Sequence, residues 1–253
     1  MTLQIQIASD LHIEYYKEDD IDISKFIKPS APILILAGDI GNLYRKTQLE
    51  NFLKNVCKEF KAVIYVPGNH EYYKRSDHQP IPFYKLNFIL TDIERLIENL
   101  YILRQDCIQI NDTYFVGCTL WSKYQLPILP KFIVRIKGFN KDFYNNLYYR
   151  DVTYIKKMMH YCKKNDGKLV VITHHVPTYN IDYKQKKLDK YKSLYFSNLD
   201  YLMKSENMST WICGHIHYNF DKMTFGGVRL VSNQKGKPKD NIQDYSSEFV
   251  INV

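Results

Sequence analysis

Three apolar runs that each end in a cluster of polar residues restrict most strongly how this chain can fold. Residues 33–37 and 62–66 are continuously apolar, which is typical of strands buried on both faces of a sheet. Residues 3–8 alternate between apolar and polar side chains and also predict a strand. The polar clusters that follow are Ser9-Asp10-Leu11-His12, Gly38-Asp39 and Pro67-Gly68-Asn69-His70-Glu71. Because ligands of open α/β sheets bind at the carboxyl ends of the strands, we expect these clusters to share one site.

The remaining periodicity predicts further strands and several helices. Apolar residues recur at helical spacing in residues 48–60 and 85–99, and residues 151–164 predict an amphipathic helix. Residues 197–207 also have a helical pattern. Further strands are predicted at residues 100–103, 107–110, 114–118, 168–172, 211–213, 218–223, 228–232 and 248–253, with a hairpin turn at residues 111–112. This mixture of strands and helices predicts an α/β fold.

Two stretches have no regular periodicity. Residues 121–150 contain Pro127 and Pro130 among aromatic and basic residues, and residues 178–195 are polar and rich in lysine. We expect residues 1–253 to form a single domain in which these two excursions form a lid over the site.

Composition indicates a soluble protein of a reducing compartment. Of the 253 residues, 45% are hydrophobic and 25% are charged, which is typical of globular proteins. The five cysteines are odd in number and lack CxxC spacing, which argues against a disulfide framework or a thiolate zinc site. The first residues lack the pattern of a signal peptide, and no run reaches the roughly 18 apolar residues of a membrane span. We therefore expect a cytoplasmic protein, whose net charge of +8 would attract polyanions.

Histidines gather at the predicted strand ends. The strand at residues 211–213 leads into Gly214-His215-Ile216-His217. In an extended strand, residues two apart share a face, so His215 and His217 could point at one metal ion; two solvated loop histidines are the alternative. The ligand-type residues at all strand ends are Asp10, His12, Asp39, Asn69, His70, His174, His175, His215 and His217, which include six of the eight histidines. Five strand ends that each supply such a residue favour a metal site over separate structural roles.

These ordered motifs resemble those of the calcineurin-like metallophosphoesterase superfamily. They are Asp10-Leu11-His12, Gly38-Asp39, Gly68-Asn69-His70-Glu71, His174-His175-Val176-Pro177 and Gly214-His215-Ile216-His217. The resemblance covers residues 5–220 and implies two mixed β-sheets packed as a sandwich and flanked by helices, a four-layer αββα fold. A later segment, residues 232–238, resembles an Asn-Pro-Arg-Gly segment of one branch of the superfamily, but Gln234 and Lys235 replace the proline and the arginine.

The resemblance also implies a binuclear metal centre. The first divalent ion would be bound by Asp10, His12, His217 and Asp39, and the second by Asp39, Asn69, His174 and His215, with Asp39 shared. Mixed nitrogen and oxygen ligands suit manganese, which we expect, and also iron or zinc, with magnesium as a further candidate. A hydroxide that bridges the two ions would attack the phosphorus of a phosphate ester.

The same resemblance assigns roles to neighbouring residues. His70 would contact the scissile phosphate or protonate the leaving oxygen. Either ring of the His174-His175 pair could be the ligand; the resemblance favours His174, which leaves His175 to face the substrate or the core. Asp10 could orient His70, and Glu71 is expected to brace its loop rather than to react.

A metal-dependent phosphoric ester hydrolase is the activity that the resemblance implies, but its metal ligands are shared by enzymes for monoesters and diesters. The basic charge and the aromatic residues Tyr72, Tyr73, Trp121 and Tyr124 favour a phosphodiester or nucleotide and allow a nucleic acid, through phosphate attraction and base stacking; packing within the loops is the alternative role of these aromatic side chains. The alternatives are a phosphomonoesterase and a non-catalytic metal-binding scaffold of the same fold. A structural zinc site of a nucleic-acid-binding protein is disfavoured because finger-type Cys/His spacing is absent.

Overall fold

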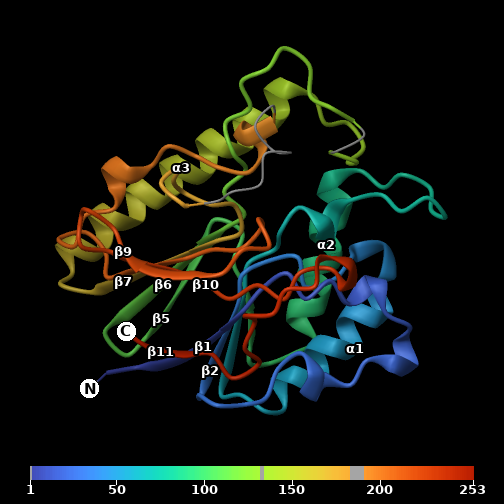
Figure 1. The fold of residues 1–253 in the computed structure, drawn as a ribbon, viewed down its shortest axis with the longest axis horizontal. Helices are drawn as coiled ribbons and strands as arrows, with labels where there is room; N and C mark the ends of the chain where they lie inside the picture. Colours follow the sequence, from blue (N-terminus) through green and yellow to red (C-terminus); the bar gives the residue numbers. More distant parts are fainter. Residues whose placement is uncertain (1, 132–133, 183–190) are drawn as a thin grey trace.

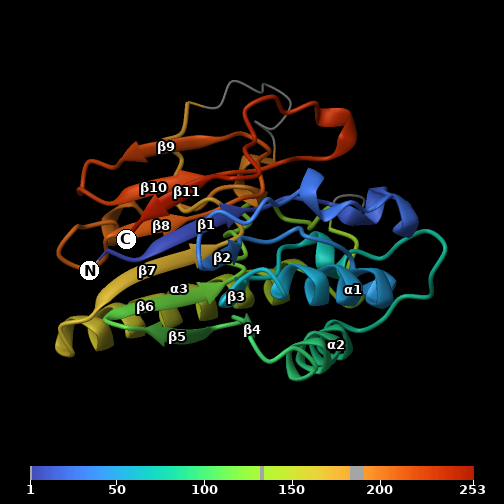
Figure 2. The ribbon, with the colours of Figure 1, turned by 90° about the horizontal axis from the view of Figure 1, so that it is seen from below.

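The computed structural model describes residues 2–131, 134–182 and 191–253, and two β-sheets form the centre of these residues (Figures 1 and 2). The first sheet has the strand order β11-β1-β2-β3-β4, and the second has the order β5-β6-β7-β8-β10-β9. The strands of the first sheet are β11 (Val250–Asn252), β1 (Gln4–Ala8), β2 (Ile33–Leu36), β3 (Ala62–Tyr65) and β4 (Leu100–Ile102). Those of the second are β5 (Asp106–Ile110), β6 (Thr113–Cys118), β7 (Lys168–Thr173), β8 (Thr210–Ile212), β10 (Arg229–Ser232) and β9 (Phe220–Met223).

Helices cover the outer faces of the two sheets. In Figure 2, α1 (Lys46–Cys57) and α2 (Phe83–Arg95) lie beside the first sheet, and α3 (Lys141–Lys164) lies along the second. Because α1 and α2 are the crossovers between β2, β3 and β4, these strands run parallel. The helix predicted at residues 48–60 and the one predicted at 85–99 are both confirmed, with ends that differ by a few residues.

A hydrophobic core lies between the two sheets. Because strand side chains alternate between faces, every second residue of a central strand points into this space. The core contains Ile5, Ile7, Ile33, Ile35, Ala62 and Ile64 from the first sheet and Phe115, Val170, Ile172, Ile212 and Val231 from the second. The residues between them, such as Leu34 and Val171, belong to the core that includes the helices. The predicted sandwich of two mixed sheets flanked by helices is therefore confirmed.

The carboxyl ends of β1, β2 and β3 lie side by side, because the three strands are parallel neighbours in consecutive register. The polar clusters that follow them therefore share one edge, as predicted. The motifs at residues 174–177 and 214–217 follow β7 and β8, which are parallel neighbours in the second sheet. The predicted site therefore spans the edges of both sheets.

Two predictions of helices are wrong. Helix α3 begins at Lys141, ten residues earlier than predicted, because Asn140 caps it by accepting a hydrogen bond from the Phe143 N–H at 2.8 Å. Its first turns bury Tyr144 and Leu147, which did not stand out in an aromatic stretch. The segment predicted as a helix at residues 197–207 contains only a short 3-10 turn, Asp200–Leu202.

The second predicted excursion, residues 178–195, is described only in part, since residues 183–190 lie outside the described residues. Among the residues that the structure describes, no helix combines the length and the apolar character that crossing a bilayer requires.

Asp151 is a buried carboxyl group in α3. Its Oδ1 accepts a hydrogen bond from Gln105 Nε2 at 2.7 Å, and its Oδ2 accepts one from the Trp121 N–H at 3.3 Å. Burial raises the pKa of Asp151 from 3.8 to about 7, because desolvation penalises the charged form more than these hydrogen bonds stabilise it. The folded state therefore binds this proton more tightly than the unfolded chain does, and its stabilising effect is lost as pH rises toward 7.

We predict that raising the pH from 5 to 8 lowers the unfolding free energy of the wild type by on the order of 3 kcal/mol more than it lowers that of Asp151→Asn, which has no carboxyl group to titrate at this position. Urea denaturation of both proteins at several pH values measures this difference. Asp92→Asn, at an exposed position of α2, should follow the wild type at every pH. A wild-type curve that stays parallel to that of Asp151→Asn would contradict the prediction.

Candidate metal centre

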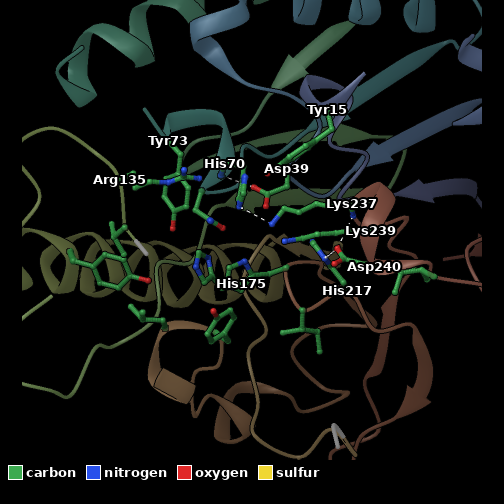
Figure 3. A pocket seen from close by; sticks show the side chains of 18 residues that line it. Tyr15, Asp39, His70, Tyr73, Arg135, His175, His217, Lys237, Lys239 and Asp240 are labelled. Atoms are coloured by element: carbon green, nitrogen blue, oxygen red, sulfur yellow. Dashed lines mark hydrogen bonds and ion pairs between the residues drawn. The ribbon is translucent and has the colours of Figure 1, made fainter. Parts of the chain in front are cut away.

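All nine predicted site residues lie in loops at the carboxyl ends of five strands. Asp10 and His12 follow β1, Asp39 follows β2, Asn69 and His70 follow β3, His174 and His175 follow β7, and His215 and His217 follow β8. A cavity of about 630 Å³ opens over these loops (Figure 3). The predicted residues that line it are Asp39, Asn69, His70, His175, His215 and His217. The other three, Asp10, His12 and His174, are fully buried beneath its wall.

Asp10, His12 and His217 form one group of ligand-type side chains. The Nε2 atom of His217 lies 3.3 Å from Oδ1 of Asp10 and 3.1 Å from Nε2 of His12. Oδ2 of Asp39 lies 3.7 Å from Nε2 of His12. The structure therefore brings together the four residues predicted to bind the first metal ion.

Asp39, His174 and His215 form a second group. The Nε2 atom of His174 lies 3.3 Å from Oδ1 of Asp39, 3.0 Å from Oδ1 of Asn69 and 3.1 Å from Nδ1 of His215. These are the four residues predicted for the second ion. The two carboxylate oxygens of Asp39 thus face different groups, and Asp39 lies between them.

In three of these histidines, the Nδ1 atom hydrogen-bonds to an oxygen atom that lies outside the two ligand groups. Nδ1 of His12 lies 3.0 Å from Oε1 of Glu14, Nδ1 of His217 lies 2.6 Å from Oδ2 of Asp240, and Nδ1 of His174 lies 2.9 Å from the carbonyl oxygen of residue 37. Because these oxygens accept hydrogen bonds, Nδ1 donates in each case, and the lone pair of the neutral ring is on Nε2. Each Nε2 therefore faces the interior of the site as metal-binding histidines do.

Glu14 and Asp240 were not predicted. Glu14 lies two residues beyond the Asp-x-His motif, and its acidic side chain at that spacing was a signal in the sequence. Asp240 follows His217 by 23 residues and belongs to a 3-10 turn, Pro238–Asp240, so no local pattern connects the two.

The side-chain nitrogen and oxygen atoms that face the interior of the site are better placed to bind divalent cations than to hydrogen-bond with one another. With its proton on Nδ1, the neutral ring of His174 has no N–H at Nε2 to donate to the oxygens of Asp39 and Asn69 that lie beside it. Within the described part of the chain, the buried Nε2 of His215 has no hydrogen-bond partner. Unpaired lone pairs of nitrogen together with carboxylate oxygens are the donor set of a transition-metal site.

The electrostatics of the cluster also favour a cation. Burial opposes ionisation of Asp39, but His174 and His70 hold the pKa of this carboxyl well below its usual range. Burial alone would lower the pKa of His174, yet Asp39 raises it to about 9. Burial alone would also lower the pKa of His217, but hydrogen bonds to Asp10 and Asp240 raise it to about 9. A cluster of carboxylates that draws protons to its histidines also attracts metal ions.

The backbone of the site is strained. Asp10, His12, Asp39, His215 and His217 all have left-handed φ angles, of 52°, 48°, 53°, 81° and 51°. Such angles are uncommon for residues other than glycine and often occur at functional sites. The extended strand considered for residues 214–217 is therefore wrong. The turn instead directs the ring of His217 to His12 and that of His215 to His174.

Two glycines let the loops come close together. Gly38 has a φ of +88°, and a Cβ atom at this position would collide with the ring of His174. A Cβ atom at Gly68 would collide with the carboxylate of Asp39. Glycine is therefore required beside both residues.

Glu71 braces the loops after β2 and β3, as predicted. Its Oε2 accepts hydrogen bonds from the N–H groups of Asp39 at 3.1 Å and Gly68 at 2.8 Å. Its Oε1 accepts from the N–H of Ile40 at 2.7 Å and from the hydroxyl of Tyr65 at 2.6 Å. The side chain is fully buried, and burial raises its pKa against the effect of these donors. It fixes the backbone of Asp39 without facing the cavity.

His70 lies in the cavity wall next to both groups. Its N–H donates a hydrogen bond to Oδ1 of Asp39 at 2.8 Å, and its Nδ1 lies 3.6 Å from Oε1 of Glu14. Glu14, rather than the Asp10 considered from the sequence, is thus the carboxylate beside this ring. Nε2 of His70 lies 3.3 Å from the ammonium nitrogen of Lys237. Burial lowers the pKa of His70 to about 4.

His175 lies behind the second group. Its Nδ1 is 3.2 Å from the carbonyl oxygen of Thr119, and its ring centroid is 4.0 Å from that of His215. It lines the cavity although the side chain is almost fully buried. Burial lowers the pKa of His175 to about 3, so the ring is neutral near neutral pH.

The aromatic residues near the site differ from those expected. Tyr72, Trp121 and Tyr124 are 1%, 3% and 2% exposed and pack in the core, so they do not stack on a substrate from the cavity wall. Tyr73 does line the cavity. The unpredicted residues of this wall include Tyr15, Arg135, Tyr144, Tyr195, Lys237 and Lys239.

We predict that Glu71→Gln lowers the unfolding free energy by about 2–4 kcal/mol, because either amide orientation turns an NH₂ group toward a buried backbone N–H. Urea denaturation measures the effect. Glu50→Gln, which alters only a surface ion pair with Lys54, should change stability by less than about 1 kcal/mol. Equal effects of the two substitutions would show that the brace is not needed.

Comparisons with known proteins agree with this geometry. The model of the calcineurin-like phosphoesterase family matches residues 3–219. The uncharacterized protein L509 of Acanthamoeba polyphaga mimivirus is 24% identical over an alignment of 276 residues, and this alignment covers 96% of this chain and 95% of that protein.

Two solved structures share the fold. The phosphopantetheinyl hydrolase PptH of Mycobacterium tuberculosis has 15% identity and a TM-score of 0.72, covering 100% of this chain and 96% of the other. A dimetal phosphatase from Danio rerio has 11% identity and a TM-score of 0.52, covering 91% and 86%. Because the family model spans most of its length, this chain belongs to the calcineurin-like phosphoesterase family.

Proposed function

We propose that this protein hydrolyses a phosphate ester with the help of two divalent metal ions. The first would be bound by Asp10, His12, His217 and Asp39, and the second by Asp39, Asn69, His174 and His215. The position of Asp39 carries the proposal, because its Oδ2 lies 3.7 Å from His12 Nε2 and its Oδ1 lies 3.3 Å from His174 Nε2. A carboxylate placed in this way can bind one cation with each oxygen and offset their mutual repulsion. The mixed donors favour manganese, and they also suit iron or zinc.

When bound, two such cations supply acidified water as a nucleophile and neutralise charge on the phosphoryl oxygens. The chain's own residues orient the reacting groups. Glu14 and Asp240 hold the rings of His12 and His217 so that Nε2 faces the site. His70 lines the cavity with its Nε2 beside the Lys237 ammonium nitrogen, where the ring would contact the scissile phosphate or the leaving oxygen.

The cavity wall supports a nucleotide as the substrate, whose reacting phosphate is a monoester or a diester. Tyr15 and Tyr73 offer aromatic rings for a base, and Arg135 supplies positive charge 5.4 Å from the Tyr73 ring. A non-catalytic scaffold is the weaker alternative, because the chain keeps every ligand-type residue of the motifs and also His70.

We predict that Asp39→Asn abolishes manganese-dependent hydrolysis of p-nitrophenyl phosphate and bis-(p-nitrophenyl) phosphate, because the neutral amide cannot offset the repulsion between two cations. Release of p-nitrophenol measures activity, and plasma mass spectrometry measures bound manganese. Asp92→Asn, at an exposed position far from the motifs in the sequence, is the control that should keep wild-type activity. Full activity of Asp39→Asn with manganese added would refute the mechanism.

We predict that His70→Ala retains bound manganese but loses about 10²- to 10⁴-fold in turnover, the usual contribution of a side chain that takes part in acid–base catalysis. The manganese content of the purified variant and its kcat for both substrates decide the outcome. Loss of one manganese ion would instead make His70 a ligand, which is a role that its group with His12 and Asp39 would allow.

A further inference from the structure

Lys237 places a positive charge beside His70 at the edge of the cavity. Its ammonium nitrogen lies 3.3 Å from Nε2 of His70, and the side chain is half-buried. In Figure 3, Lys237 extends toward His70 from one side, and Tyr73 and Arg135 lie on the other. Among the described residues, Lys237 forms no ion pair with a carboxylate. The Asp240 carboxylate lies near enough to interact electrostatically with Lys237, but it pairs with His217 rather than with the ammonium group, which can therefore bind an anion in the cavity.

The backbone of Lys237 is fixed to the metal centre. Its N–H donates a hydrogen bond to Oδ2 of Asp240 at 2.9 Å, and the Asp240 N–H donates to the Lys237 carbonyl oxygen at 2.9 Å. The same Oδ2 atom lies 2.6 Å from Nδ1 of His217. One carboxylate therefore holds both the lysine backbone and the ring of a predicted metal ligand, and Lys237 keeps its position relative to the site.

The neighbouring Lys235 provides a contrast. It occupies the position of the arginine in the Asn-Pro-Arg-Gly segment, but its ammonium nitrogen lies 5.3 Å from the ring centroids of both Phe26 and Tyr245. It also donates a hydrogen bond to the carbonyl oxygen of Lys25 at 3.2 Å. Lys235 does not line the metal-site cavity, whereas Lys237, two residues later, does.

We propose that Lys237 determines specificity by binding one unesterified oxygen of the reacting phosphate, and that it thereby selects phosphomonoester dianions, such as a terminal nucleotide phosphate, over diesters. This inference rests on the proposed function. A monoester has three unesterified oxygens, enough for two metal ions and one lysine. A diester has only two. Its second ester oxygen is a poor hydrogen-bond acceptor, and the group attached to that oxygen would collide with the Lys237 ammonium group. Because Lys237 Nζ and His70 Nε2 are 3.3 Å apart, one phosphate can contact both.

Binding of two probes to manganese-loaded protein at pH 8 tests this proposal without turnover. The probes are inorganic phosphate, which is a dianion at this pH, and dimethyl phosphate, and calorimetry measures each Kd. The wild type should bind inorganic phosphate at least about tenfold more tightly. Lys237→Met should weaken phosphate binding by about 10- to 100-fold and leave dimethyl phosphate within about twofold, since a hydrogen bond to a charged group is lost. Lys237→Arg should restore most of the preference, and Lys235→Met should match the wild type.

Manganese content, measured for every variant, should equal that of the wild type. Equal weakening of both probes in Lys237→Met, no weakening of either, or a wild type that does not prefer phosphate would each overturn the proposal. Hydrolysis is a separate measurement: the ratio of kcat/KM for p-nitrophenyl phosphate to that for bis-(p-nitrophenyl) phosphate should fall in Lys237→Met by the same factor. A wild type that prefers phosphate but hydrolyses neither ester would refute the proposed function and leave the binding role of Lys237 in place.

Discussion

Two buried carboxylates surrounded by histidine rings are the constraint on which the rest of this structure depends. Asp10 and Asp39 are 0% and 1% exposed, and a buried charge is costly unless it is compensated. Part of the compensation comes from the backbone, because the N–H of His215 donates to Asp10 at 3.0 Å and that of His70 donates to Asp39 at 2.8 Å. The first of these bonds joins loops from the two different sheets, so the site exists only when the sandwich is assembled.

The sandwich also stabilises a strained backbone. Five site residues have left-handed φ angles, each of which costs on the order of 1–3 kcal/mol. Such angles persist only where the surroundings fix them, and here parallel strands, the glycines beside Asp39 and His174, and the buried Glu71 carboxylate do so. The result is a set of side chains whose directions are fixed in advance, as the ligands of a metal site must be.

The outer wall of the cavity is built differently from the ligand cluster. Apart from Tyr144 in α3, its tyrosines, Arg135 and the turn at residues 237–240 lie outside the long helices and the strands, and that turn follows the part of the chain that the family model matches. Through Asp240, which contacts both His217 and Lys237, the wall is nevertheless fixed to the predicted metal ligands. Loops of this kind can change the substrate while the chemistry of the centre stays the same.

The amino-acid sequence determined the strands, the order of the motifs and the residues that could bind metal ions. It did so because a buried apolar run followed by Asp or His has a local signature, as at Ile33–Leu36 and Asp39.

Tertiary packing alone decided which distant partners these residues have. Asp240 beside His217 and Lys237 beside His70 are contacts of the folded chain, and they join segments 23 and 167 residues apart. It also decided that residues 214–217 turn rather than extend, and that Tyr72 and Trp121 pack inside. The physical reason is that periodicity reports which face of an element is apolar, whereas contacts between distant polar groups and the burial of loop aromatics depend on how the two sheets come together.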